Sequence, residues 1–148
     1  MRLLGHPLHP ALVHFPLGLL LSATVADLAW AAALTRNTQV GAVMMAAGLA
    51  AALPAMVAGM FDFASLDQKV VPHALRHMAA VGVAWTGYGM ALFLRKGSLL
   101  AGDQLTTASI VVSIGSALLL ALGGWLGGRL VYTYGAGVER AKGIEPSS

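Results

Sequence analysis

The sequence contains no cysteine and few charged or aromatic residues. Of its 148 residues, 10% are charged and 7% are aromatic. Without cysteine the chain can form no disulfide, no thiolate zinc site and no iron–sulfur ligand set, and it has no thiol nucleophile. The low charge, together with a hydrophobic content of 57%, excludes an ordinary water-soluble domain.

Signals for hydrolysis, phosphoryl transfer or nucleic-acid binding are also missing. We find no nucleophile–base pair, no phosphate-binding loop and no paired carboxylates, so hydrolase and kinase chemistry have no basis. The nine Lys and Arg residues are scattered, with no run longer than Arg95-Lys96. This pattern argues against a nucleic-acid surface. No catalytic residue is predicted.

Four long apolar segments dominate the chain. A hydrocarbon core of about 30 Å requires roughly 20 apolar residues of helix, and the sequence supplies such segments at about 10–34, 40–64, 72–94 and 105–130. Short polar connections make successive helices antiparallel neighbours. We therefore expect an all-α fold: an integral membrane four-helix bundle of up-down topology within residues 1–134, with both termini on one side. A flexible C-terminal tail is predicted at 135–148.

Basic residues predict the orientation of this bundle. Six Lys and Arg residues fall at the N-terminus, the second connection and the C-terminal end, whereas three fall in the other two connections. Lys and Arg are enriched on the cytoplasmic side of membrane proteins, so both termini are predicted to be cytoplasmic. The two helix pairs show no convincing internal repeat in sequence, which disfavours an inverted-repeat transporter.

All five histidines are predicted to lie on one side of the membrane. The first span begins with three and the third span with two: His6, His9, His14, His73 and His77. His14 and His77 each follow a proline at a helix start by four or five residues, so both should lie about one turn inside the membrane. Imidazoles at similar depth on different helices suit a metal centre, because imidazole binds haem iron, zinc and copper.

Simpler interpretations remain open for each polar residue. A single histidine at a helix start is commonly placed at the headgroup level, and His6 and His9 are expected to be solvated. Asp62, at the end of the second span, could orient a ligand histidine or pair with Lys69 or Arg76. Asp27 is predicted near the opposite face and outside the histidine cluster.

Glycines are concentrated in the fourth span, in the stretch GGWLGG. There Gly123 and Gly127, like Gly124 and Gly128, form small-xxx-small pairs that let another backbone approach closely. These pairs can serve helix packing, make room for a flat cofactor, or allow a homo-oligomer to form through this helix.

Several segments resemble a bacterial membrane family of unknown function, DUF2231. They are GHPLHPALVHFPLG, LPAMVAGMFDF, HALRH and GGWLGGRLVYTYGAGV, and the resemblance extends from Gly5 to about Val138. The resemblance implies a four-helix module in the bacterial inner (plasma) membrane. It also implies that the His-Pro segment, Asp62 and His73 belong to the family motif, whereas Asn often stands at the position of His77. His73 is therefore the safer ligand on this ground, and relatives joined to a Rieske-type domain imply a redox role.

Three functions follow as hypotheses. The first is a small b-type cytochrome-like protein with one haem near the cytoplasmic face, bound by His14 and by His73 or His77. It would exchange single electrons with a quinone or with a Rieske-type or soluble partner, so the sequence leaves open whether it is part of an oxidoreductase. The second is a zinc or copper site formed by a subset of His9, His14, His73, His77 and Asp62. The third is a cofactor-free proton-linked permease or structural partner subunit.

Overall fold

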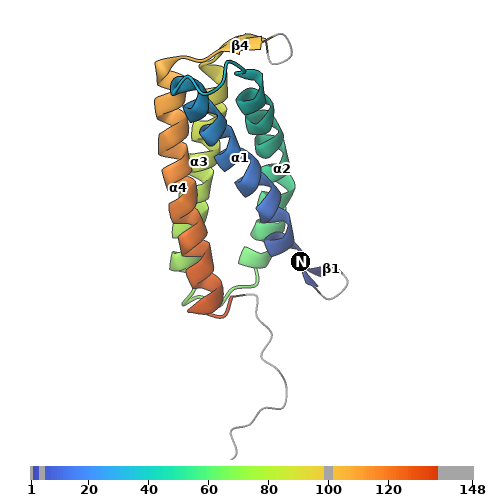
Figure 1. The fold of residues 1–148 in the computed structure, drawn as a ribbon. Coiled ribbons are helices and arrows are strands. Elements are labelled where there is room, and N and C mark those ends of the chain that lie inside the picture. The colour runs from blue at the N-terminus through green and yellow to red at the C-terminus, as the bar shows by residue number, and fades with distance from the viewer. Residues whose placement is uncertain (1, 4–5, 99–101, 137–148) are drawn as a thin grey trace, which may run out of the picture.

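Four long helices form the described part of the chain, which in this computed structural model comprises residues 2–3, 6–98 and 102–136. They run alternately up and down (Figure 1), as α1 (Leu8–Ala31), α2 (Gln39–Phe63), α3 (Val71–Phe93) and α4 (Thr107–Tyr132). Each bound lies within three residues of the predicted span. The predicted four-helix bundle is confirmed, and α1 begins at the end of the bundle where α4 ends.

Short strands and local caps complete the elements. β1 (Arg2–Leu3) pairs with β2 (His6–Pro7), and β3 (Lys96–Ser98) pairs with β4 (Gly102–Gln104), both antiparallel. The Thr106 hydroxyl accepts the backbone N–H of Ser109 at 3.1 Å and caps α4. Gly135, with φ of 65°, ends α4 in the left-handed conformation that glycine adopts without strain. Beyond Gly135 and Ala136, the predicted tail lies outside the described residues.

The bundle consists of two helical hairpins. In the first hairpin α1 packs closely on α2, and in the second hairpin α3 packs closely on α4, whereas the packing between the hairpins is sparser. We call the end where α1 and α3 begin the histidine end. The opposite end, where Asp27 and Arg95 form an ion pair, is called the ion-pair end. Towards the histidine end α1 leans away from α4 and stays beside α2 (Figure 1). The hairpins are thus closest at the ion-pair end.

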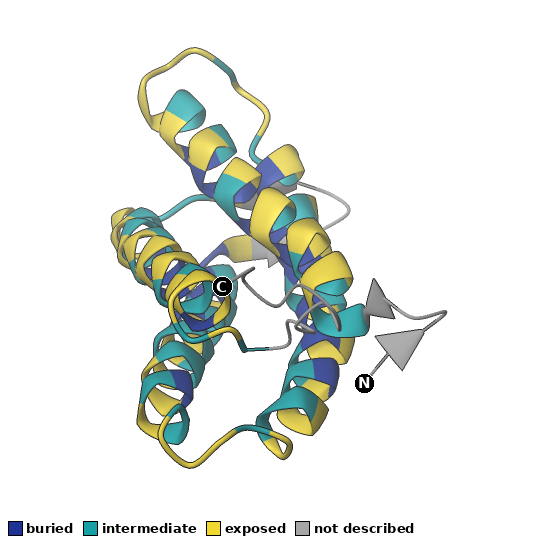
Figure 2. Ribbon diagram, turned by 90° about the horizontal axis from the view of Figure 1, so that it is seen from below, coloured by how far each residue is buried: buried dark blue, intermediate teal, exposed yellow. Residues whose placement is uncertain are grey.

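Burial in the bundle is the reverse of that in a water-soluble protein. Large apolar side chains face outward, among them Phe15, Val111 and Leu118, which are 62–70% exposed. Buried positions are mostly small or hydroxyl-bearing, such as Ala42, Ala84 and Ser109, and exposed residues cover the outside of the helices (Figure 2). Small residues in the interior and large apolar ones outside are typical of helices packed in lipid.

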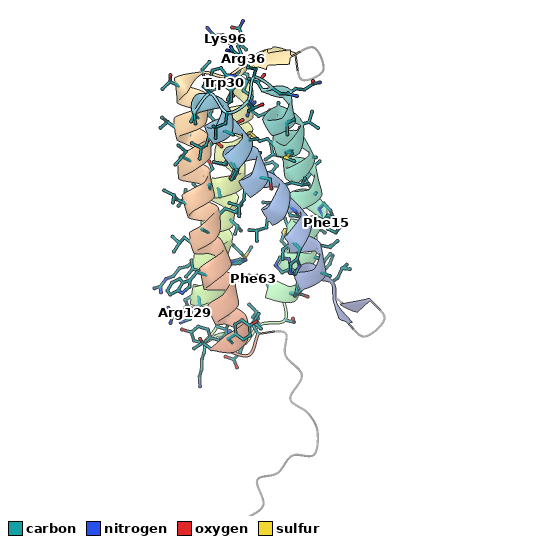
Figure 3. The ribbon with its side chains drawn as sticks, viewed as in Figure 1. Phe15, Trp30, Arg36, Phe63, Lys96 and Arg129 are labelled. Atoms are coloured by element: carbon teal, nitrogen blue, oxygen red, sulfur yellow. The ribbon has the colours of Figure 1, made fainter. Side chains whose placement is uncertain are left out.

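Of the helices that the structure describes, three are long and apolar enough to cross a membrane: α1, α2 and α4. α3 has a comparable length of 23 residues, but it carries His73, Arg76 and His77 near its start and is less apolar. Charged side chains lie near the ends of the bundle: Arg36 and Lys96 at the ion-pair end, and Arg129 towards the histidine end (Figure 3). An apolar middle with charged ends matches the thickness profile of a bilayer.

Candidate functional site

His9 lies in the first turn of α1 and packs against α2. Its Nδ1 is 2.8 Å from the backbone carbonyl oxygen of Ala55. Because a carbonyl oxygen can only accept, Nδ1 carries the proton, and Nε2 of the neutral ring keeps its lone pair. The ring is half-buried, so the expectation that His9 is solvated is wrong. The reason is that α1 begins at Leu8 and places His9 inside the helix rather than before it.

His77 makes the same arrangement in the second hairpin. Its Nδ1 is 2.8 Å from the carbonyl oxygen of Gly123 in α4, which again leaves Nε2 as the unprotonated nitrogen. In both hairpins the histidine and its acceptor are 46 residues apart. The structure therefore places one imidazole of each hairpin at the histidine end, each with Nδ1 bonded to a helix carbonyl of its own hairpin.

This correspondence extends over both hairpins as an internal repeat. A spacing of 68 residues relates Asp27 to Arg95, and the same spacing relates His9 to His77. The buried positions Pro16, Leu20 and Ala23 of α1 correspond to Ala84, Tyr88 and Ala91 of α3. Likewise Gly41, Met45, Gly48, Ala52 and Ala55 of α2 correspond to Ser109, Ser113, Ser116, Leu120 and Gly123 of α4. The interpretation that the chain has no internal repeat is corrected by this finding.

The repeat is a parallel one. Each unit is a hairpin that starts at the histidine end, so the two units point the same way. Repeats of this kind are related by an axis along the membrane normal, in contrast to the inverted repeats of many transporters. Residues 68 positions apart thus occupy corresponding places in the two hairpins, as His9 does near the start of α1 and His77 near the start of α3.

The other predicted ligands have different surroundings. His14 is exposed; five residues after His9, it points about 140° away from it around α1. His73 stacks on Tyr134, with ring centroids 4.3 Å apart and an interplanar angle of 24°. The Tyr134 hydroxyl is also 3.3 Å from Nδ1 of His73. The side chain of His6 lies outside the described part of the chain.

No compact cluster of metal ligands forms among the described residues. Within them, no three His, Asp or Glu side chains gather closely enough to hold one ion. Asp62 is half-buried at the histidine end, and its backbone oxygen accepts the hydroxyl of Ser65 at 2.8 Å. Among the described histidines, His9 and His77 thus share the same bonding of Nδ1 to a helix carbonyl.

A buried ion pair lies at the opposite end of the bundle. Arg95 contacts the Asp27 carboxylate at 2.5 Å, and both side chains are nearly inaccessible, at 3% and 1% exposure. Arg95 also donates to the carbonyl oxygen of Thr38 at 3.3 Å. Asp27 is thus outside the histidine region, as the sequence suggests. Its pairing with Arg95 was missed because the two residues lie 68 positions apart.

A group of hydroxyls lies one turn from this ion pair. The Thr24 hydroxyl is 2.9 Å from the Tyr88 hydroxyl and 2.8 Å from the Ser113 hydroxyl. Thr24 belongs to the first hairpin, whereas Tyr88 and Ser113 belong to the second, so these bonds join the hairpins. Trp85 adds a bond from its indole N–H to the carbonyl oxygen of Leu49 at 3.1 Å.

The fold and its outward apolar surface define a membrane-type helical bundle built from two like hairpins. The model of the family described as predicted membrane protein (DUF2231) matches residues 5–140, so the chain belongs to this family. The resemblance seen in the sequence is thereby confirmed. No curated protein and no solved structure matches the chain.

Proposed function

We propose that this protein is a small membrane cytochrome of b type, in which His9 and His77 would hold one haem. Bound haem iron would supply a one-electron redox change. The residues of the chain bind and orient the group and exclude water from it. The proposal keeps the haem function expected from the sequence but assigns the ligands differently, with His9 in place of His14.

The observation that carries the proposal is the pair of matched imidazoles. Metal-ligating histidines usually donate their second ring N–H to a carbonyl or carboxylate, which fixes the tautomer and the ring orientation. His9 and His77 both donate Nδ1–H to a helix carbonyl at 2.8 Å. Each ring thus has one nitrogen held by the protein and one with a lone pair available to a metal.

The number of donors favours haem over a single zinc or copper ion. Structural zinc takes four protein ligands and catalytic zinc takes three, whereas the described residues bring no such group together. A porphyrin already supplies four equatorial nitrogens, so haem iron needs only two axial ligands from the protein. Two imidazoles, one on each hairpin, meet that requirement.

The location at the histidine end indicates where electrons would be exchanged. Lys69, Arg76 and Arg129 lie towards this end, and a basic end favours the cytoplasmic side of a bacterial inner membrane. His77 lies six residues into α3, roughly 9 Å from its start. A centre at this depth could exchange electrons with a quinone in the bilayer or with a soluble or Rieske-type partner at the membrane surface.

The test is the absorbance spectrum of the full chain, purified in detergent after expression with a haem supply. We expect a Soret band and a sharp reduced α band, with one haem per chain. His9→Ala and His77→Ala should each abolish the low-spin spectrum. His14→Ala and His73→Ala, matched replacements at the same end of the bundle, should leave it intact.

Three results would contradict this assignment. Loss of the spectrum in His14→Ala and His73→Ala, with retention in the other two variants, would favour the ligands expected from the sequence. A protein without haem that holds zinc or copper by elemental analysis would favour the non-haem site. A folded protein with neither group would support a permease or a structural subunit.

A further inference from the structure

Two glycines lie directly against the imidazoles of the proposed centre, at equivalent positions of the internal repeat. A Cβ atom built on Gly59 would be 3.0 Å from Cε1 and 3.1 Å from Nδ1 of His9. A Cβ atom built on Gly127 would be 3.0 Å and 3.1 Å from the same atoms of His77. Contacts this short require the neighbouring ring to move by a few tenths of an ångström. Only glycine leaves the rings where they are.

Each glycine lies one helical turn beyond the carbonyl that the histidine bonds. Ala55 and Gly59 share one face of α2, and Gly123 and Gly127 share one face of α4. Each ring therefore lies across a single turn, bonded at Nδ1 and in contact near Cε1. Nε2 is farther from the glycine than Cε1 and Nδ1 are, at 3.6 Å from the Gly59 Cβ position and 3.8 Å from the Gly127 Cβ position. The close contact with each glycine thus falls on the Nδ1–Cε1 edge of the ring.

Other glycines of the chain show what ordinary helix packing looks like. A Cβ on Gly48 would meet the Leu20 side chain at 2.8 Å, and a Cβ on Gly123 would meet a methyl of Val81 at 2.6 Å. Gly124 and Gly128 have nothing within 4 Å. Gly59 and Gly127 differ from all of these because their close neighbour is a histidine ring in both hairpins.

We infer that Gly59 and Gly127 are positioning residues, which hold the imidazoles of His9 and His77 in place for the proposed ligand. This inference rests on the proposed function for the identity of the ligand. Two equivalent nitrogens, one from each repeat, would suit a metal group that takes the same protein ligand twice. His9, the Ala55 carbonyl and Gly59 form one copy of the holding unit; His77, the Gly123 carbonyl and Gly127 form the other.

The experiment compares Gly59→Ala and Gly127→Ala with Gly128→Ala and Gly124→Ala in the full chain. With haem bound, we expect the first two variants to change the electron paramagnetic resonance g-values, which report the orientation of the axial imidazoles. Their haem retention should fall roughly 10- to 100-fold, as for lost outer-shell support of a metal ligand. Both control variants should match the wild-type protein.

A second measurement needs no haem. In the chain labelled with 15N-histidine, Gly59→Ala should shift the ring nitrogen resonances of His9 alone, and Gly127→Ala those of His77 alone. If the rings shift but the wild-type protein binds no haem, the positioning inference stands and the haem proposal fails. If haem binds and neither the ring resonances nor the g-values differ from those of Gly128→Ala, the positioning inference is overturned and the haem proposal stands. Circular dichroism of each variant checks that the helices are formed.

Discussion

The two ends of the bundle use the same two hairpins in different ways. At the ion-pair end, residues of the two hairpins bond to each other directly, as Asp27 does with Arg95 and Thr24 with Tyr88. At the histidine end, His9 and His77 bond only within their own hairpins, to Ala55 and Gly123. One end therefore holds the hairpins together, and the other carries the two histidines of the proposed centre, one on each hairpin.

This division separates stability from ligand binding. A buried ion pair and buried hydroxyls are costly unless every partner is satisfied, so the ion-pair end tolerates little change. The histidine end requires only that each ring be held against its own helix. Substitutions at the ion-pair end should thus affect unfolding, whereas substitutions at the histidine end should affect the ligand spectrum.

The largest effect is expected from Arg95→Leu. The Asp27 carboxylate, 1% exposed, would lose its buried countercharge, which costs about 3–5 kcal/mol of unfolding free energy. Unfolding in a detergent titration measures this loss. Lys96→Leu, at the neighbouring exposed position, should change stability by no more than about 0.5 kcal/mol. Adding Asp27→Asn to Arg95→Leu should restore most of the loss, and a double variant as unstable as the single one would contradict this account.

A smaller loss of unfolding free energy is expected from Gly41→Ala than from Arg95→Leu. A Cβ at Gly41 would collide with the Asp27 carboxylate and come within 3.3 Å of the Ala23 carbonyl oxygen. Overpacking of this kind costs about 1–3 kcal/mol. Gly18→Ala is the matched control, because nothing lies within 4 Å of its Cβ position and alanine is the better helix former. Equal stability of the two variants in the same titration would show that Gly41 is not needed for the ion pair.

Removal of one hydroxyl at the ion-pair end should lower the free energy of unfolding by less than Gly41→Ala does. Tyr88→Phe loses the bond to Thr24, and side-chain hydrogen bonds within membrane proteins contribute about 0.6 kcal/mol on average. Thr86→Val serves as the control, since the exposed Thr86 hydroxyl bonds only the Gly82 carbonyl of its own helix. The comparison fails if Thr86→Val lowers the unfolding free energy as much as Tyr88→Phe does.

The last prediction concerns distances rather than energies. The chain has no cysteine, so spin labels attach only where cysteine is introduced. We expect labels at Phe15 and Trp125 to show a broader distance distribution without haem than labels at Val25 and Val111. All four positions are exposed, the first pair at the histidine end and the second at the ion-pair end. Haem should narrow only the first distribution; equal widths without haem would contradict the comparison.

The architecture could be predicted from the sequence because it depends on few variables. Apolar runs of sufficient length and short connections determine the helices, and antiparallel threading then places His9, His14, His73 and His77 at one end. These arguments need only helix geometry and the thickness of a bilayer.

The surroundings of His9 were harder to predict because they depend on where α1 begins. We expected Pro10 to mark the first turn, which would leave His9 outside the helix. The helix begins at Leu8, and a proline at the third position is tolerated because the first four N–H groups have no partner within the helix. That shift of two residues moves His9 from the expected water boundary to the contact with Ala55.

The internal repeat was missed because equivalent positions of the two hairpins are alike in burial but often differ in residue type. Leu20 corresponds to Tyr88, and Asp27 corresponds to Arg95, so aligned positions differ in size or charge. The histidines and the glycines beside them do coincide at the same spacing, as His9 with His77 and Gly59 with Gly127. A search for repeated His and Gly at one fixed spacing could have found the unit before the structure.

Asp27 and Arg95 carry opposite charges at equivalent positions of the two hairpins. This difference affects which hairpins can pack on each other. If the first hairpin paired with the first hairpin of a second copy, Asp27 would face Asp27; a pair of second hairpins would bring Arg95 to Arg95. Both arrangements bury like charges, which costs several kcal/mol. The buried pair of Asp27 and Arg95 therefore favours packing of a first hairpin on a second hairpin, as occurs within one chain.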